Sequence, residues 1–115
     1  MTVEEVRELF GYNAWANRRI FDALVQLPAE QYLRDLKSSF GSIHGTVCHI
    51  VWAEQLWLHR WLAKAAPGTP QGQDLAGLAE ARARWETVEA ERTAFLAGLT
   101  EPRLRDTVTI QPTSG

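Results

Sequence analysis

The stretch that decides the fold is residues 42–62, SIHGTVCHIVWAEQLWLHRWL. It opens on Ser42, a residue type that caps helix N-termini, and continues with apolar residues that few charges interrupt. The apolar side chains fall on nearly every side of a helical projection, which is typical of a helix buried at the centre of a fold. The sequence therefore predicts a central helix over residues 43–65, with three of the chain's five tryptophans in it.

Two amphipathic helices are predicted on either side of this central one. Residues 2–27 repeat apolar side chains every three or four positions, and Thr2 with Glu5 forms a capping box at the start. Residues 74–99 carry a second such seam, with Asp74 as the expected cap and a face of mixed Glu and Arg that suits a solvated surface. Together the three long helices predict an all-α, up-down helical bundle.

The C-terminal tail has a different pattern. Residues 106–111 alternate polar and apolar side chains, which predicts a short strand, and residues 112–115 are typical of a turn. A length of 115 residues suits one domain. We therefore expect a single domain over residues 1–115 that ends in a strand-like tail.

Composition excludes several classes of protein. Twelve basic residues against fourteen acidic ones, with the arginines scattered, argue against a nucleic-acid partner. The chain has no apolar run of the roughly 18 residues that a membrane span needs. Cys48 is the only cysteine, so no intrachain disulfide can form, and its neighbour His49 points about 100° away on a helix, which argues against a nucleophilic Cys–His dyad. We expect a cytoplasmic protein without membrane contact.

All three histidines, His44, His49 and His59, lie on the predicted central helix. On a continuous helix they are separated by about 7.5 Å, 15 Å and 22 Å along the axis. Bonds between a metal ion and a histidine nitrogen are only about 2.0–2.1 Å long. No two of these imidazoles can therefore share one ion, and a metal site would need ligands from elsewhere.

Polar residues also lie on faces that should be buried. Glu54 is near the centre of the most apolar face of the central helix, where a carboxylate needs a partner. It either orients a metal ligand or a tryptophan N–H, or, as we favour, forms a buried ion pair with Arg82 or Arg92. Asn13 and Asn17, one turn apart on the core seam of the first helix, either line a central polar pocket or fix the register of the helices.

Three motifs resemble the DinB/YfiT-like superfamily of metal-dependent four-helix bundles. They are YNAWAN at residues 12–17, SIHGTVCHI at 42–50 and AEQLWL at 53–58, in the order and spacing of that superfamily. The resemblance implies a divalent ion (nickel, zinc or manganese) held by three histidines, the first of which corresponds to His49. It also implies a relation to thiol-dependent transferases and isomerases, with a small molecule or low-molecular-weight thiol as substrate.

The chain departs from the superfamily pattern at its C-terminal end. The other two ligands normally lie on a fourth helix, in a His-x-x-x-His arrangement that this sequence does not contain. We therefore expect a bundle truncated before that helix, with an incomplete three-histidine site and no cofactor required for folding. An apolar groove should open in place of the missing helix, and a homodimer centred on the tryptophan-rich helix would cover it.

Two hypotheses follow for the function. In the first, the chain is a divalent-metal-binding member of the superfamily with reduced catalytic capacity, and His49 is its metal ligand. In the second, it is a catalytically inactive homodimeric interaction module. Metal retention and the effect of a His49 substitution distinguish the two.

Overall fold

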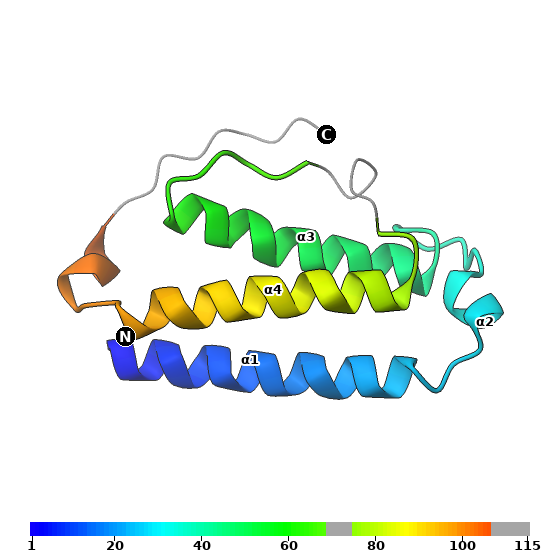
Figure 1. The fold of residues 1–115 in the computed structure, drawn as a ribbon, viewed down its shortest axis with the longest axis horizontal. Coiled ribbons are helices and arrows are strands. Elements are labelled where there is room, and N and C mark those ends of the chain that lie inside the picture. Colours follow the sequence, from blue (N-terminus) through cyan, green and yellow to red (C-terminus); the bar gives the residue numbers. More distant parts are fainter. Residues whose placement is uncertain (69–74, 107–115) are drawn as a thin grey trace.

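In the part of the chain that the structure describes, three long helices and two short ones make up the fold (Figure 1). The computed structural model describes residues 1–68 and 75–106. The long helices are α1 (Val3–Leu24), α3 (Ile43–Trp61) and α4 (Leu78–Ala97). The short ones are α2 (Ala29–Leu33) and the 3-10 helix η2 (Pro102–Arg105). The predicted all-α bundle is confirmed.

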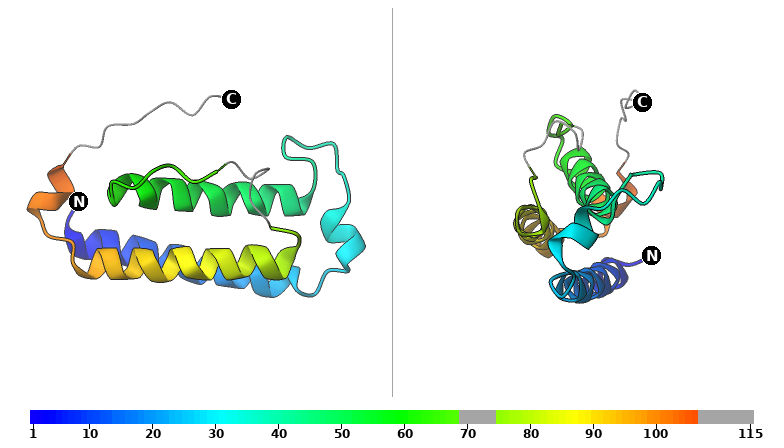
Figure 2. Two further views of the ribbon diagram at one scale, coloured as in Figure 1. Left: turned by 45° about the horizontal axis from the view of Figure 1, so that its top comes forward. Right: turned by 90° about the vertical axis from the view of Figure 1, so that its right-hand side faces the viewer.

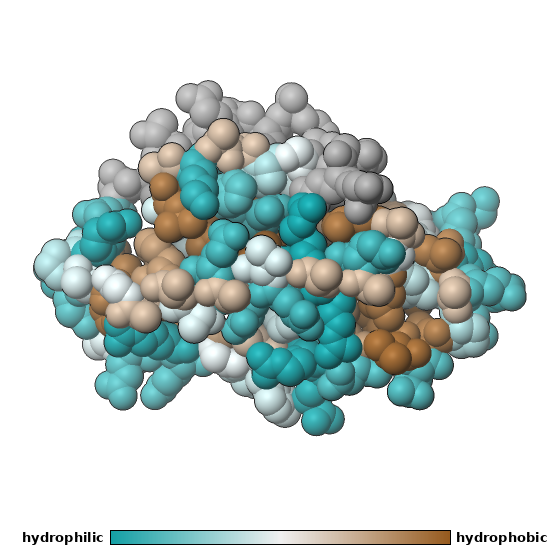
Figure 3. Space-filling model, viewed as in Figure 1, coloured by the Kyte–Doolittle hydropathy of each residue, from teal (hydrophilic) through white to brown (hydrophobic). Residues whose placement is uncertain are grey.

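Helix α4 packs against both other long helices, whereas α1 and α3 make fewer contacts with each other. Seen end-on, the three long helices lie at the corners of a triangle (Figure 2). The side of the triangle between α1 and α3 is therefore the least closely packed one. The outer face around α4 is largely hydrophilic, with apolar patches toward its two ends (Figure 3).

The predicted helix starts agree with the observed caps. The Thr2 hydroxyl accepts a hydrogen bond from the Glu5 backbone N–H at 3.1 Å, as in a capping box. The Ser42 hydroxyl accepts one from the Gly45 N–H at 3.0 Å. Helix α4 begins later than predicted, after Gly77, and Asp74 lies outside the described residues.

The helix ends fall earlier than the apolar pattern suggested. Helix α3 stops at Trp61 instead of residue 65 because Ala63 adopts a left-handed conformation with φ of 56°. The Lys64 N–H then bonds back to the His59 carbonyl at 2.8 Å, which closes a Schellman motif. Helix α1 ends at Leu24, and shorter-range backbone bonds continue the turn to Leu27.

The core forms where α1, α2, α3 and α4 meet. Its central cluster contains Trp85, which is 2% exposed and packs against Phe21 at a ring-centroid distance of 5.4 Å. The other buried members of the cluster are Ala14, Tyr32, Val47, Val51 and Ala81.

The C-terminal part contains an element that the sequence pattern did not suggest. Pro102–Arg105 form a turn of 3-10 helix, which Asp106 ends. The predicted strand over residues 106–111 lies, beyond Asp106, outside the described residues. Within the described ranges, no helix combines the length and apolar character needed to cross a membrane.

Candidate functional site

His44, on α3, connects this helix by hydrogen bonds to α2 and to the segment before α4. Its Nδ1 lies 2.6 Å from the Tyr32 hydroxyl of α2, and its Nε2 lies 2.8 Å from the Leu75 carbonyl, before α4. A carbonyl oxygen can only accept, so Nε2 carries the hydrogen and Nδ1 accepts the Tyr32 O–H. Both ring nitrogens are therefore used in holding the bundle together.

Cys48 lies one turn after His44, and its Sγ is 3.4 Å from the His44 Nε2. Burial raises the pKa of the Cys48 thiol, and burial together with nearby acidic groups raises the pKa of the Tyr32 hydroxyl beyond its ordinary range. Both groups stay protonated at neutral pH. The thiol is accordingly a buried, protonated group, and the histidine that its sulfur contacts is His44, not the adjacent His49 considered in the sequence.

These raised pKa values predict a loss of stability in alkali. The unfolded chain releases the thiol proton near its ordinary pKa of about 8.5 and the phenol proton near about 10, while the folded chain retains both. Above about pH 8.5 the unfolded state therefore binds fewer protons, and the free energy of unfolding should fall as pH rises. Urea titrations at neutral and alkaline pH measure the slope. A Tyr32→Phe/Cys48→Ala variant should lose less stability across that range, and an unchanged slope would contradict the explanation.

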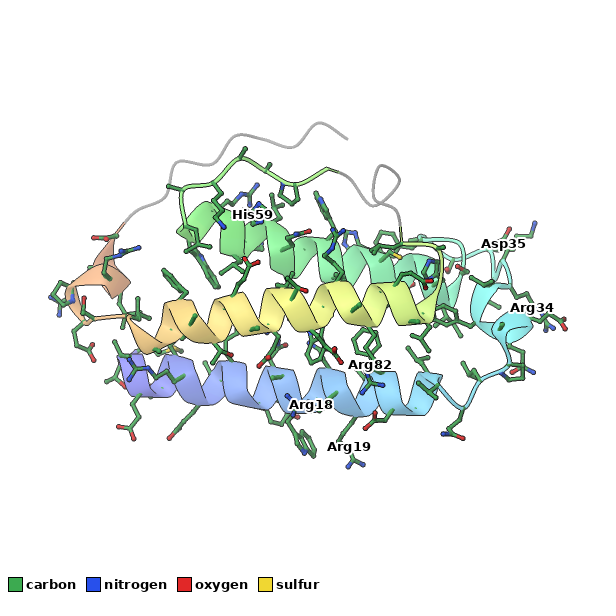
Figure 4. All side chains as sticks on the ribbon, in the orientation of Figure 1. Arg18, Arg19, Arg34, Asp35, His59 and Arg82 are labelled. Atoms are coloured by element: carbon green, nitrogen blue, oxygen red, sulfur yellow. The ribbon has the colours of Figure 1, made fainter. Side chains whose placement is uncertain are left out.

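His59 is held near the C-terminal end of α3. It projects toward the segment that follows the helix (Figure 4), and its Nδ1 lies 2.9 Å from the Ala65 carbonyl. Because that carbonyl accepts, Nδ1 donates. The ring thus helps to fasten the residues after the helix end.

His49 is the histidine whose nitrogens bond to no group of the described residues. Its half-buried ring stacks on Phe40 at a centroid distance of 4.2 Å and an interplanar angle of 17°. The Trp52 ring lies 5.8 Å from the His49 ring, tilted by 40°. Aromatic contacts therefore fix the ring while both nitrogens stay available to a ligand.

Gly45 sets the position of the Phe40 ring. A β-carbon at residue 45 would overlap the Phe40 carbonyl, so only glycine lets the loop come this close to the first turn of α3. The loop itself turns at Gly41, whose φ of 82° is in the left-handed region. Two glycines thus place Phe40 against His49.

The described residues do not assemble a complete metal site. They contain no group of three or more His, Cys, Asp or Glu side chains placed to hold one ion. The separation of His44, His49 and His59 along a single helix explains why no two of these histidines share an ion.

A second polar cluster centres on one carboxylate oxygen between the long helices. Glu54 Oε1 accepts from Asn13 Nδ2 at 2.6 Å, from Asn17 Nδ2 at 3.3 Å and from Arg92 Nη1 at 3.3 Å. Of the two partners foreseen for Glu54, Arg92 forms the pair, whereas Arg82 bonds to Asp22 of α1 at 2.8 Å (Figure 4). The Glu54 ion pair was foreseen, but the sequence did not indicate that both asparagines bind the same oxygen.

This cluster lies at a pocket of about 340 Å³ between α1 and α3. The pocket is lined by Phe10, Asn13, Ala53, Glu54, Trp57, Trp61 and Arg92. Glu54 Oε2 and Arg92 Nη2 are buried there without a hydrogen-bond partner in the described part of the chain. Trp57 is 43% exposed. On this side of the bundle, aromatic surface therefore borders the polar groups of Glu54 and Arg92.

Comparison with known proteins identifies the family of this chain. The model of the DinB family matches residues 1–115, the whole chain. The chain belongs to the DinB family. Protein DinB of Bacillus subtilis (strain 168) is 35% identical over 57 residues, a match that covers 50% of this chain and 33% of that protein. No solved structure matches significantly.

Family membership therefore rests on a match over the full chain, while the DinB relative from Bacillus subtilis matches only a third of its own length. This DinB-family chain has the bundle that the motifs implied, with YNAWAN on α1 and SIHGTVCHI at the start of α3.

Proposed function

We propose that this DinB-family chain takes part in divalent-metal binding through His49, in a protein related to thiol-dependent transferases. Nickel, zinc and manganese are the candidate ions, and a low-molecular-weight thiol or another small molecule is the candidate substrate. The observation that carries the proposal is the difference among the three histidines. Both nitrogens of His44 and the Nδ1 of His59 are bonded to protein groups, whereas neither nitrogen of His49 bonds to any of the described residues.

The surroundings of His49 suit a metal ligand in one further respect. An imidazole that binds a metal must be neutral and must hold a fixed orientation. The stacking contacts with Phe40 and Trp52 restrict the ring without using its nitrogens. The remaining ligands must come from a second copy or from outside the described residues, because the described ones supply no three-ligand group.

Equilibrium dialysis against nickel, zinc and manganese ions, followed by elemental analysis, tests the proposal. The wild-type chain should retain one of these ions, and His49→Ala should lose most of it because the ligand is removed. His59→Ala is the matched control. It removes a histidine from the same helix, but the Nδ1 of this histidine donates a hydrogen bond to the Ala65 carbonyl. No retained metal, or equal retention by the His49→Ala variant, would refute the metal proposal.

A homodimeric interaction module without catalysis is the second candidate. The exposed Trp57 and Ile50 side chains on α3 favour it, because large apolar side chains gathered on one helix commonly mark an interface. Light scattering on the same samples distinguishes the two candidates. A dimer that retains no metal supports the interaction module, and a metal-free species at the 13.0 kDa chain mass contradicts both.

A further inference from the structure

One pocket lies away from His49, at the end of the bundle where η2 packs. Its volume is about 560 Å³, within the range of about 300–1,000 Å³ that is usual for small-molecule sites. Its apolar lining comes from α1, α3, α4, η2 and the segment between the last two, and includes Val6, Phe10, Trp61, Phe95, Leu99 and Leu104. The pocket has no residue in common with the surroundings of His49.

Aromatic rings give this pocket a defined wall. Trp61 meets Phe10 edge-on at a centroid distance of 5.6 Å and stacks on Phe95 at 5.9 Å. Packed rings keep their positions without a ligand, so the apolar wall is preformed. A ligand with an apolar body would lose little free energy to rearrangement of this wall.

The charged residues around the pocket determine which head group such a ligand carries. Arg60, Arg103 and Asp106 all line it. Arg103 is paired with Asp106 at 3.2 Å. The Arg60 guanidinium lies 4.7 Å from the centre of the Trp57 ring and has no carboxylate partner among the described residues. Two cations against one anion leave a single positive charge without a counter-charge.

We propose that this pocket binds a monoanionic amphiphile, a carboxylate on an apolar body, with the carboxylate at Arg60 and Arg103 and the body against Trp61 and Phe95. The charge complements the unbalanced guanidinium, and a carboxylate matches guanidinium geometry. The apolar body removes exposed aromatic surface from water. This assignment does not depend on metal binding by His49, because the two sites have no residue in common.

Decanoate is a suitable probe. Decan-1-ol and decylamine are its controls, because they have the same ten-carbon chain with a neutral and a cationic head group. Titration calorimetry should show one decanoate per chain, with decanol about tenfold weaker and decylamine weaker still. Tryptophan fluorescence should change on decanoate binding, and Trp61→Phe should remove most of the change. Absence of decanoate binding, or equal affinity for decanol, would refute the proposal.

Variants at the rim test the assigned residues. Arg60→Gln/Arg103→Gln should weaken decanoate binding about tenfold and leave decanol binding unchanged. Both arginines are at least partly exposed, so the variant should fold, which circular dichroism checks. Arg105→Gln is the matched control because Arg105 belongs to η2 but does not line the pocket. Equal effects of the double variant and the control would show that the arginines do not hold the carboxylate.

Discussion

Replacing Arg92 with methionine is expected to lower the free energy of unfolding by about 3–5 kcal/mol, because breaking a buried ion pair leaves the other charge uncompensated. Arg92 is only 3% exposed and pairs with Glu54 at 3.3 Å. Its guanidinium also lies 5.0 Å from the centre of the Phe10 ring. Methionine keeps much of the side-chain volume but removes the charge, so the decrease in the free energy of unfolding measures the loss of the ion pair with Glu54. Urea unfolding of the wild type and the variant measures it.

A double variant distinguishes loss of the pair from loss of packing. Glu54→Met/Arg92→Met removes both charges and should be more stable than Arg92→Met alone, since no buried carboxylate is then left without a counter-charge. The gain is reduced by the loss of the acceptor that Asn13 and Asn17 share. Glu30→Met/Arg34→Met is the matched control, because that pair is exposed and should contribute no more than about 1 kcal/mol. A double variant as unstable as Arg92→Met would show that packing, and not charge, determines the effect.

Gly45→Ala is expected to lower the free energy of unfolding by about 1–3 kcal/mol, the usual cost of overpacking. The added methyl group overlaps the backbone carbonyl of Phe40, so the loop must shift away from α3. That shift should separate the Phe40 and His49 rings and change the chemical environment of the histidine. Urea unfolding measures the first effect, and the His49 proton resonances measure the second.

Gly11→Ala is the control for this substitution. A β-carbon at Gly11 meets nothing within 4 Å, and the residue is in the middle of α1. Alanine there should stabilise the chain by about 0.5–1 kcal/mol, because glycine is a poor helix former. If Gly45→Ala behaved like Gly11→Ala, the close approach of the loop to α3 would be wrong.

Local sequence patterns were sufficient to predict the three long helices and two of their caps. Thr2 and Ser42 cap because their side chains bond to backbone groups three residues away, and such an interaction is fully encoded locally. The helix ends were less predictable. The apolar pattern continues past Trp61, but the left-handed Ala63 ends the helix, and alanine gives no signal for that conformation.

The sequence indicated which residues belong to the polar cluster around Glu54, but not how they are arranged. Glu54 stood out as a carboxylate on an apolar face, and Asn13 and Asn17 as amides on a core seam. That all three meet at one oxygen depends on how α1 docks beside α3, which single-helix geometry cannot supply. The partners of His44 were unpredictable for the same reason, since they come from α2 and the segment before α4.

Nitrogen NMR of the three imidazoles during a zinc titration is the most direct test of the assignment of His49. Long-range proton–nitrogen spectra report the tautomer of each ring and the nitrogen that a metal binds. We predict that one nitrogen of His49 shifts on zinc addition, while His44 keeps its hydrogen on Nε2 and His59 keeps its hydrogen on Nδ1. Shifts at His44 or His59 with none at His49 would contradict the assignment of His49 as the metal ligand.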